Sequence, residues 1–456
     1  MKSCRLILSG RNKISVWWMV LIFGAVCFAR MYRETIYKAV VGDKTAGRVE
    51  VQKIPWESLS DIDIEEETSS EDSQGKSQPL HDAVVSSTIE TEKNSIFHTN
   101  FSSEHIRVLE ERKTRVDEFC KKNINTRGAM TEISGYKPAN FSYCIVQKAG
   151  CTLYVRLLKY LNGESKYRAS PLDITKFQTH YLNSKFFVHF NMKHSGDFDF
   201  VMNSFRSMTV RNPYTRLWSA YIDKFILPDF WSSKGKEIVR RTRYSATPEA
   251  LRCGKDVTFS EFVQYIILTN GSFISWHQDK HWLPASDLCD PCTFKPHLIG
   301  KQETFLPDII ITLQQLKLES MLTFINSVNP TEFEIKDEID YNFRIFPLHA
   351  KCTNKLELAK RIWTAFQLNG YLPLKTNFPD IVEGQRLSSS SFYQIILDER
   401  KKINITKEDI RRQRVWSLKN AYLNLSKDQI LSLKHLYHKD FEAFGYDENP
   451  DYLPSY

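Results

Sequence analysis

The first residue placed to do chemistry is a lysine in a short loop of small residues, Gln147-Lys-Ala-Gly-Cys-Thr152. The residues before it, 141–146, are aromatic and β-branched, which predicts a buried strand. After it, leucines recur at helical spacing as far as Leu161. A strand, a tight loop and a helix in this order point free backbone N–H groups and the positive end of the helix at one place. Such a place binds a phosphate or a sulfate, and Lys148 adds a full charge.

The loop lacks the G-x-x-x-x-G-K-[ST] pattern of a Walker A motif. Taken alone, this stretch is explained equally well as an ordinary strand–helix turn that contains a lysine.

A second candidate anion site follows residues 207–210, which also read as a short strand. Asn212 is a favourable N-cap residue, and Pro213 suits the first position of a helix. Arg211 lies at the end of the strand, and Ser219 lies two turns into the helix. A guanidinium and a hydroxyl in this arrangement can close on one anion from two sides. The alternative is that Arg211 pairs with a carboxylate and Ser219 faces solvent.

These two stretches resemble the cofactor-binding motifs of the membrane-bound carbohydrate sulfotransferases, and more narrowly the branch of the chondroitin and dermatan 4-O-sulfotransferases and the glucuronyl 3-O-sulfotransferase. The family's P-K-x-x-C-[ST]-x-W-[KR]-R loop corresponds to residues 147–156, and its V-R-x-P-[FY]-x-R-L-x-S-A-Y-x-[DN]-K-[FY] segment corresponds to residues 210–225. The resemblance implies that the first stretch binds the 5′-phosphosulfate of 3′-phosphoadenosine 5′-phosphosulfate (PAPS) and the second its 3′-phosphate. The cofactor-binding residues so implied are Gln147, Lys148, Ala149, Gly150, Cys151, Thr152, Leu153, Arg211 and Ser219.

Further blocks agree with that branch, in the same order along the chain: residues 281–282, 287–292, 299–304 and 433–446. The first motif departs from the family at three positions. Gln147 replaces a proline, Tyr154 replaces a tryptophan, and Val155 replaces a basic residue. These departures leave a catalytically silent glycan-binding protein of the same fold as an alternative.

The resemblance implies transfer of a sulfuryl group from PAPS to a sugar hydroxyl of a glycosaminoglycan or of a glycoprotein or glycolipid glycan, with no metal required. In such an in-line displacement Lys148 neutralises charge on the leaving phosphate oxygen. The acceptor hydroxyl needs a general base. His189 is the first candidate because it lies between the two stretches, after a strand-like run at 185–188; His194 and His281 are alternatives. A nucleotide-dependent kinase is disfavoured, because Walker and kinase motifs are missing.

The N-terminus predicts a membrane anchor. Residues 14–29 form an apolar run of 16 residues, preceded by four Lys or Arg residues. At 1.5 Å per residue it spans about 24 Å, slightly less than the roughly 30 Å core of a bilayer. We expect a cytosolic tail at 1–13, a signal-anchor at 14–32, a flexible acidic stem at 33–105 and a lumenal sulfotransferase domain at 106–456, in a single-pass type II protein of the Golgi membrane. A cleaved signal peptide is the alternative.

Charge and cysteine content fit a lumenal domain. The net charge is +5 over residues 1–35, −8 over 36–105 and +11 over 106–456. A basic lumenal domain attracts polyanionic glycans rather than nucleic acid. Sequons begin at Asn100, Asn140, Asn270, Asn404 and Asn424. An oxidising lumen favours disulfides among the seven cysteines beyond the anchor. Their odd number leaves at least one thiol free unless a bridge is intermolecular, and Cys151 is the candidate. Cys289 and Cys292 have the spacing of half a zinc site, but a structural role is favoured.

The fold class predicted is α/β. Residues 106–122 read as a helix, and strands alternate with helices from 141 to 330, which predicts a P-loop-like, mainly parallel sheet flanked by helices. From residue 355 onward the chain reads as helical, with a polar serine-rich loop at 387–391.

Overall fold

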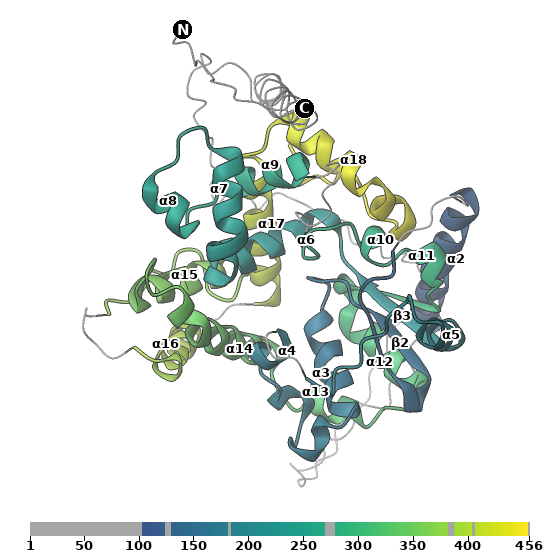
Figure 1. Ribbon diagram of the computed structural model, residues 1–456. Helices are drawn as coiled ribbons and strands as arrows, with labels where there is room; N and C mark the ends of the chain where they lie inside the picture. Colours follow the sequence, from purple (N-terminus) through teal and green to yellow (C-terminus); the bar gives the residue numbers. More distant parts are fainter. Residues whose placement is uncertain are drawn as a thin grey trace, which may run out of the picture. The chain divides into compact units, whose positions relative to one another are not determined.

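The computed structural model describes residues 103–123, 129–180, 184–269, 279–381, 387–403 and 406–454 (Figure 1). All of them belong to one of two compact units, Ile54–Tyr456. The predicted cytosolic tail and signal-anchor, and the predicted stem up to residue 102, lie outside the described residues. Within the described ranges, no helix combines the length and the apolar content that crossing a membrane requires.

The described residues include a four-stranded sheet with the spatial order β1-β2-β3-β4. The strands are β1 (Ile133–Tyr136), β2 (Phe141–Cys144), β3 (Phe205–Val210) and β4 (Leu298–Lys301). β2, β3 and β4 are parallel, and β1 is an antiparallel edge strand beside β2. The predicted strands before the two anion-binding stretches and the mainly parallel sheet are therefore confirmed.

Both faces of the sheet are covered, because β2 alternates its side chains between two apolar clusters. Phe141 and Tyr143 pack with α3 (Cys151–Leu161) and α12 (Phe305–Gln315) on one face. Cys144 packs on the other face with α2 (Ser103–Lys122), α5 (Ser195–Asn203) and the end of α18 (Lys427–Phe444). Figure 1 shows α2 and α5 beside β3.

The remaining helices form the rest of the described fold. They are α4 (Lys176–His180), α6 (Pro213–Tyr221), α7 (Lys236–Thr242), α8 (Pro248–Cys253), α9 (Phe259–Thr269), α10 (Ala285–Leu288), α11 (Pro291–Phe294), α13 (Met321–Asn326), α14 (Pro330–Ile345), α15 (Lys355–Leu368), α16 (Ser389–Lys402) and α17 (Lys407–Tyr422). The helical C-terminal part is confirmed, and α18 returns to the core, where Tyr437 and Phe441 are buried.

Two local predictions were wrong. Residues 185–188 are not a strand: 185–186 form a turn, and the segment pairs with β1 at an isolated bridge between Ser134 and His189. Residues 387–391 are not a loop either, because α16 begins at Ser389. Ser388 is its N-cap and exchanges hydrogen bonds with Ser391 in a capping box, so that the serines begin a helix.

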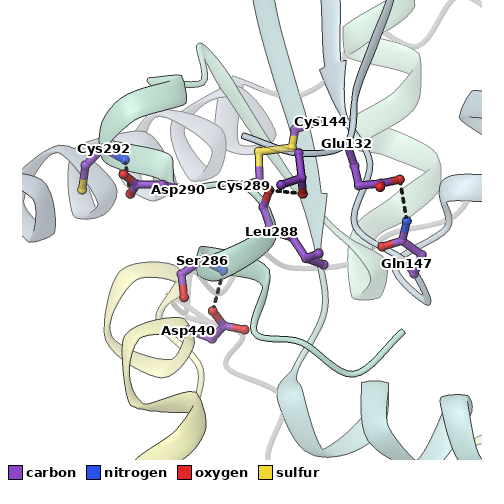
Figure 2. Close-up of a disulfide and its surroundings, with 10 residues drawn as sticks. Glu132, Cys144, Gln147, Ser286, Leu288, Cys289, Asp290, Cys292 and Asp440 are labelled. Atoms are coloured by element: carbon purple, nitrogen blue, oxygen red, sulfur yellow. Dashed lines mark hydrogen bonds between the residues drawn. A yellow bond between two sulfur atoms is a disulfide. The ribbon is translucent and has the colours of Figure 1, made fainter. Parts of the chain in front are cut away.

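Within the described residues, three disulfides join distant parts of the chain: Cys120–Cys292, Cys144–Cys289 and Cys253–Cys352. Figure 2 shows Cys144, at the end of β2, joined to Cys289, which follows α10. The predicted disulfides and the free, buried thiol of Cys151 are confirmed. Because Cys289 and Cys292 are both oxidised, they are not half of a zinc site.

Candidate active site

The loop after β2 has an unusual backbone. Lys148 and Gly150 both adopt the left-handed conformation, with φ of 66° and 81°. A Cβ atom on Gly150 would lie 2.4 Å from Cε2 of Phe305, so that a glycine is needed there for both conformation and space. Lys148 is not a glycine, so its left-handed backbone conformation costs about 1–3 kcal/mol. Backbone strain of this kind is concentrated at functional sites.

The loop offers backbone donors. α3 begins at Cys151, so its first N–H groups have no acceptor within the helix. In the described part of the chain, the N–H groups of Gly150, Cys151 and Thr152 donate to no other backbone or side-chain acceptor. The site therefore has the unpaired donors and the positive helix end that an anion requires.

Two arginines hold the loop by its carbonyl groups. Arg216, which is 1% exposed, donates from Nε to the Gln147 oxygen at 2.8 Å. The same guanidinium donates to the oxygens of Lys280 and Leu283, at 3.1 and 2.5 Å. Arg211 donates to the Lys148 oxygen at 3.2 Å. The structure therefore brings the two predicted anion-binding stretches into direct contact.

The Lys148 ammonium group contacts a carboxylate to which the sequence analysis gave no role. Lys148 Nζ lies 2.8 Å from Asp223 Oδ2. Asp223 and Lys224 belong to a π-helical turn, η5 (Ile222–Ile226), that continues α6. Burial lowers the pKa of Lys148, Asp223 acts in the opposite direction, and the nearby cations Lys176 and Lys224 lower it further.

Arg211 is held by uncharged groups. Its Nε donates to Thr215 Oγ1 at 3.1 Å, in addition to its contact with the Lys148 carbonyl. Burial lowers the Arg211 pKa, and the nearby Glu303 opposes that shift. Asn212 caps α6 and Pro213 occupies its first turn, as predicted. Ser219 lies half-buried on the same helix.

A cavity of about 670 Å³ adjoins the lysine loop. Gln147, Cys151 and Val155 line it on the side of the loop and α3. Its other lining residues include three lysines and three histidines: Lys159, Lys224, Lys280, His180, His189 and His281. A larger cavity of about 940 Å³ lies beside α4 and α14 and includes none of the loop residues. The smaller cavity is therefore the one placed for chemistry at the loop.

The histidines differ in their surroundings. His189 is exposed and lines the cavity, as a base that meets a bound hydroxyl would. His281 Nδ1 lies 2.5 Å from Asp279 Oδ1, and burial is the main cause that lowers its pKa to about 4. His194 precedes α5 as its N-cap residue and is not among the residues that line the cavity.

His180, at the end of α4, is a histidine that the sequence did not single out. Its Nε2 lies 3.3 Å from Thr152 Oγ1, in the first turn of α3. Its ring lines the cavity. Loss of hydration, then the cations Lys224 and Lys176, lower its pKa well below the usual value.

The three departures from the family motif each have a defined place. The buried Gln147 donates from Nε2 to Glu132 Oε2 at 3.3 Å (Figure 2). Tyr154 stacks on Tyr143 with ring centroids 3.9 Å apart. Val155 is buried in the cavity wall. Gln147 is therefore held by its side chain and, through Arg216, by its carbonyl group, although it lacks the rigidity of proline.

Sequence reasoning missed the residues that surround Lys148. Asp223 and Lys224 stood inside the second motif without a role, and Lys176 and His180 lay outside both motifs. Lys176 and His180 lie on a five-residue helix, and apart from these two basic residues its sequence has no feature that would have indicated a role in the site. Arg156, kept from the family motif, pairs instead with Asp337 of α14 at 2.7 Å.

Comparison with known proteins identifies the sheet-containing part of the fold. A profile described as "Sulfotransferase family" matches residues 136–344, which contain Lys148, Arg211, Ser219 and His189. This segment therefore matches the sulfotransferase family. The family predicted from the two motifs is thus confirmed, and the narrower branch stays a prediction.

Relatives of this sulfotransferase-family domain carry a more specific name. Carbohydrate sulfotransferase 11 of Mus musculus is 34% identical over 191 residues, which are 40% of this chain and 52% of the relative. Carbohydrate sulfotransferase 9 of Homo sapiens is 32% identical over 227 residues, 48% of this chain and 49% of the relative. The chain spans about half the length of the curated relatives it matches. No solved structure matches it significantly.

Proposed function

We propose that the protein is a carbohydrate sulfotransferase, which transfers a sulfuryl group from PAPS to a hydroxyl group of a glycan. The observation that carries the proposal is the contact between Arg211 and the Lys148 carbonyl. It joins a lysine-bearing anion loop and a guanidinium at the carboxyl ends of adjacent parallel strands, the edge at which ligands of open α/β sheets bind. A nucleotide with anionic groups at both ends suits two neighbouring cationic positions.

The residues present fit such a donor. The N–H groups of Gly150, Cys151 and Thr152 have no protein acceptor in the described ranges. The Asp223 carboxylate stands against Lys148 Nζ, where a phosphate or sulfate oxygen would make the same contact. In this proposal residues 147–153 hold the 5′-phosphosulfate, and Arg211 and Ser219 hold the 3′-phosphate.

The proposed reaction is an in-line displacement at sulfur. The bond between sulfur and the phosphate oxygen breaks as a bond to the acceptor oxygen forms, and negative charge builds on the leaving oxygen. Lys148, the loop N–H groups and the Thr152 hydroxyl stabilise that charge. His189 takes the proton of the acceptor hydroxyl, because it lines the cavity beside the loop. The mechanism assigns no step to a metal ion.

We also propose that the domain works in the Golgi lumen, held at the membrane by the predicted anchor at residues 14–32. The three disulfides support an oxidising compartment. The sequon residues Asn140 and Asn424, which lie within the described ranges, are both exposed. The basic charge of residues 106–456 favours a polyanionic glycan, such as chondroitin or dermatan, as the acceptor.

The test is transfer of radiolabelled sulfate from PAPS to a panel of desulfated chondroitin, dermatan, heparosan and short glucuronylated glycans. Labelling of at least one acceptor is expected. No labelling, with glycan binding intact, would instead favour the catalytically silent glycan-binding protein suggested by Gln147 and Val155. Transfer of phosphate from ATP to the same acceptors would favour a kinase.

A further inference from the structure

Three ammonium groups surround the carboxylate of Asp223. Its Oδ2 lies 2.8 Å from Lys148 Nζ and 3.1 Å from Lys224 Nζ, and its Oδ1 lies 2.9 Å from Lys176 Nζ. The lysines come from three places in the fold: the loop after β2, the turn η5 and the helix α4. None of the four side chains is more than 19% exposed. Solvent therefore does little to screen these charges from one another.

The three lysines are not compensated equally. Lys176 and Lys224 each have a second carboxylate partner, supplied by Glu338 and Asp229 respectively. Among the described residues, Asp223 is the only carboxylate within salt-bridge distance of Lys148. Lys148 therefore depends on one carboxylate that it shares with two competing cations.

A purely structural role explains this cluster poorly. The cost of removing ions from water commonly offsets their attraction, so a buried ion cluster is a weak means of fastening helices together. Asp223 and Lys224 also lie in a π-helical turn, a rare form found frequently at functional sites. Both observations connect the cluster with the chemistry of the neighbouring loop.

We propose that Asp223 and Lys176 are positioning residues, which together fix the place and the charge state of the Lys148 ammonium group; this inference rests on the proposed function. Asp223 holds the ammonium group beside the loop N–H groups while the donor is absent. Lys176 competes for the same carboxylate, so that Lys148 is held loosely enough to turn to the phosphosulfate.

The direction of each effect follows from the groups that face Lys148. They are Asp223 and Lys224 on η5, Lys176 on α4, Glu338 on α14 and Cys151 on α3, while Arg211 binds the Lys148 backbone carbonyl. Neutralising Asp223 removes the negative charge that keeps Lys148 protonated, so the pKa of Lys148 must fall. Neutralising Lys176 removes a like charge and leaves Asp223 with one cation fewer, so the pKa of Lys148 must rise.

The test measures the ionisation of Lys148 directly in the full chain, by competitive acetylation across a pH series with peptide mass spectrometry. In Asp223→Asn we expect the apparent pKa of Lys148 to fall by about 1–3 pH units, the size of a close charge–charge effect. In Lys176→Met we expect it to rise, and Asp223→Glu should keep it near the wild-type value. Lys336→Met is the control, because that lysine forms an exposed pair with Asp340.

If both variants were partly unfolded, the apparent pKa of Lys148 would shift in the same direction in both, towards that of a free lysine. Shifts of equal sign in Asp223→Asn and Lys176→Met, or no shift in either, would overturn the inference. The alkaline limb of kcat for sulfate transfer should follow the same opposite shifts. The acetylation series could show the two opposite pKa shifts while the wild-type protein transfers no sulfate. That result would contradict the proposed function and leave the positioning roles supported.

Discussion

The two ends of the candidate site hold their cations in different ways. The Lys148 ammonium group faces the Asp223 carboxylate and lies among further buried charges. The Arg211 guanidinium instead donates to a hydroxyl, Thr215 Oγ1, and to a backbone carbonyl. The carboxylate near Arg211, from Glu303, accepts from the Asn212 N–H at 3.2 Å.

This difference matches what each end has to do in the proposed reaction. Charge on the leaving oxygen grows during sulfuryl transfer, so the cation there must be able to exchange partners. A phosphate that only anchors the donor keeps its charge, and a fixed guanidinium suffices. Interactions that strengthen in the transition state act on kcat, whereas interactions equal in both states act on KM. Substitutions at the two ends should therefore separate in their kinetics.

The largest effect is expected from Lys148→Ala. Removing the ammonium group leaves the developing charge without its cation, which should lower kcat by about 10³-fold. Sulfate transfer at saturating donor measures it, with Lys193→Ala, an exposed lysine, as the control. If Lys148→Ala kept wild-type kcat and lost only donor affinity, the two ends would not differ and the comparison would break.

His189→Ala should come next, with a loss in kcat of about 10²-fold, within the usual range for a general base. The donor KM should change little, because in the proposed mechanism the histidine meets the acceptor hydroxyl rather than the donor. His194→Ala and His281→Ala are measured alongside, since both were alternative bases. If only His281→Ala lowered kcat, the proton-accepting role would belong to His281 instead of His189.

Arg211→Ala should raise the donor KM by about 10- to 100-fold, the worth of a charged hydrogen bond, with a smaller fall in kcat. Arg211→Lys should recover only part of the loss, because an ammonium group lacks the planar fork of a guanidinium. Calorimetric binding of 3′-phosphoadenosine 5′-phosphate gives the same comparison without turnover, and Arg252→Ala, on an exposed position, is the control. Unchanged affinity in Arg211→Ala would defeat the assignment of the 3′-phosphate site.

The sequence predicted the parts of this site that are local in the chain. The strand before Lys148, the helix after it and the Asn212–Pro213 helix start follow from short-range patterns, and the structure has all three. The residues that surround Lys148 could not be predicted in this way. Lys176 on α4 reaches Asp223 on η5 across 47 positions of the chain, a tertiary contact that no short-range pattern encodes.

The two wrong local predictions have different origins. Residues 185–188 have the composition of a strand, but the segment pairs with the outer edge of β1 at one isolated bridge. A strand forms only where a neighbouring strand pairs with it along its length, which composition does not reveal. The serines at 388–391 were read as a loop because serine is polar. Their spacing is also that of a capping box, and the structure uses them to start α16.

The smallest and sharpest test of the comparison is Ser219→Ala. A single hydroxyl that donates to the 3′-phosphate is worth about 0.5–1.5 kcal/mol, so the donor KM should rise by about 2- to 10-fold. Because the proposal assigns this hydroxyl to the 3′-phosphate, whose charge does not change during the reaction, kcat should stay at the wild-type value. Ser219→Thr keeps the hydroxyl and should keep the affinity. If Ser219→Ala lowered kcat and left KM unchanged, Ser219 would act at the reacting end beside Lys148. The proposed difference between the Lys148 end and the Arg211 end would then be wrong for this residue.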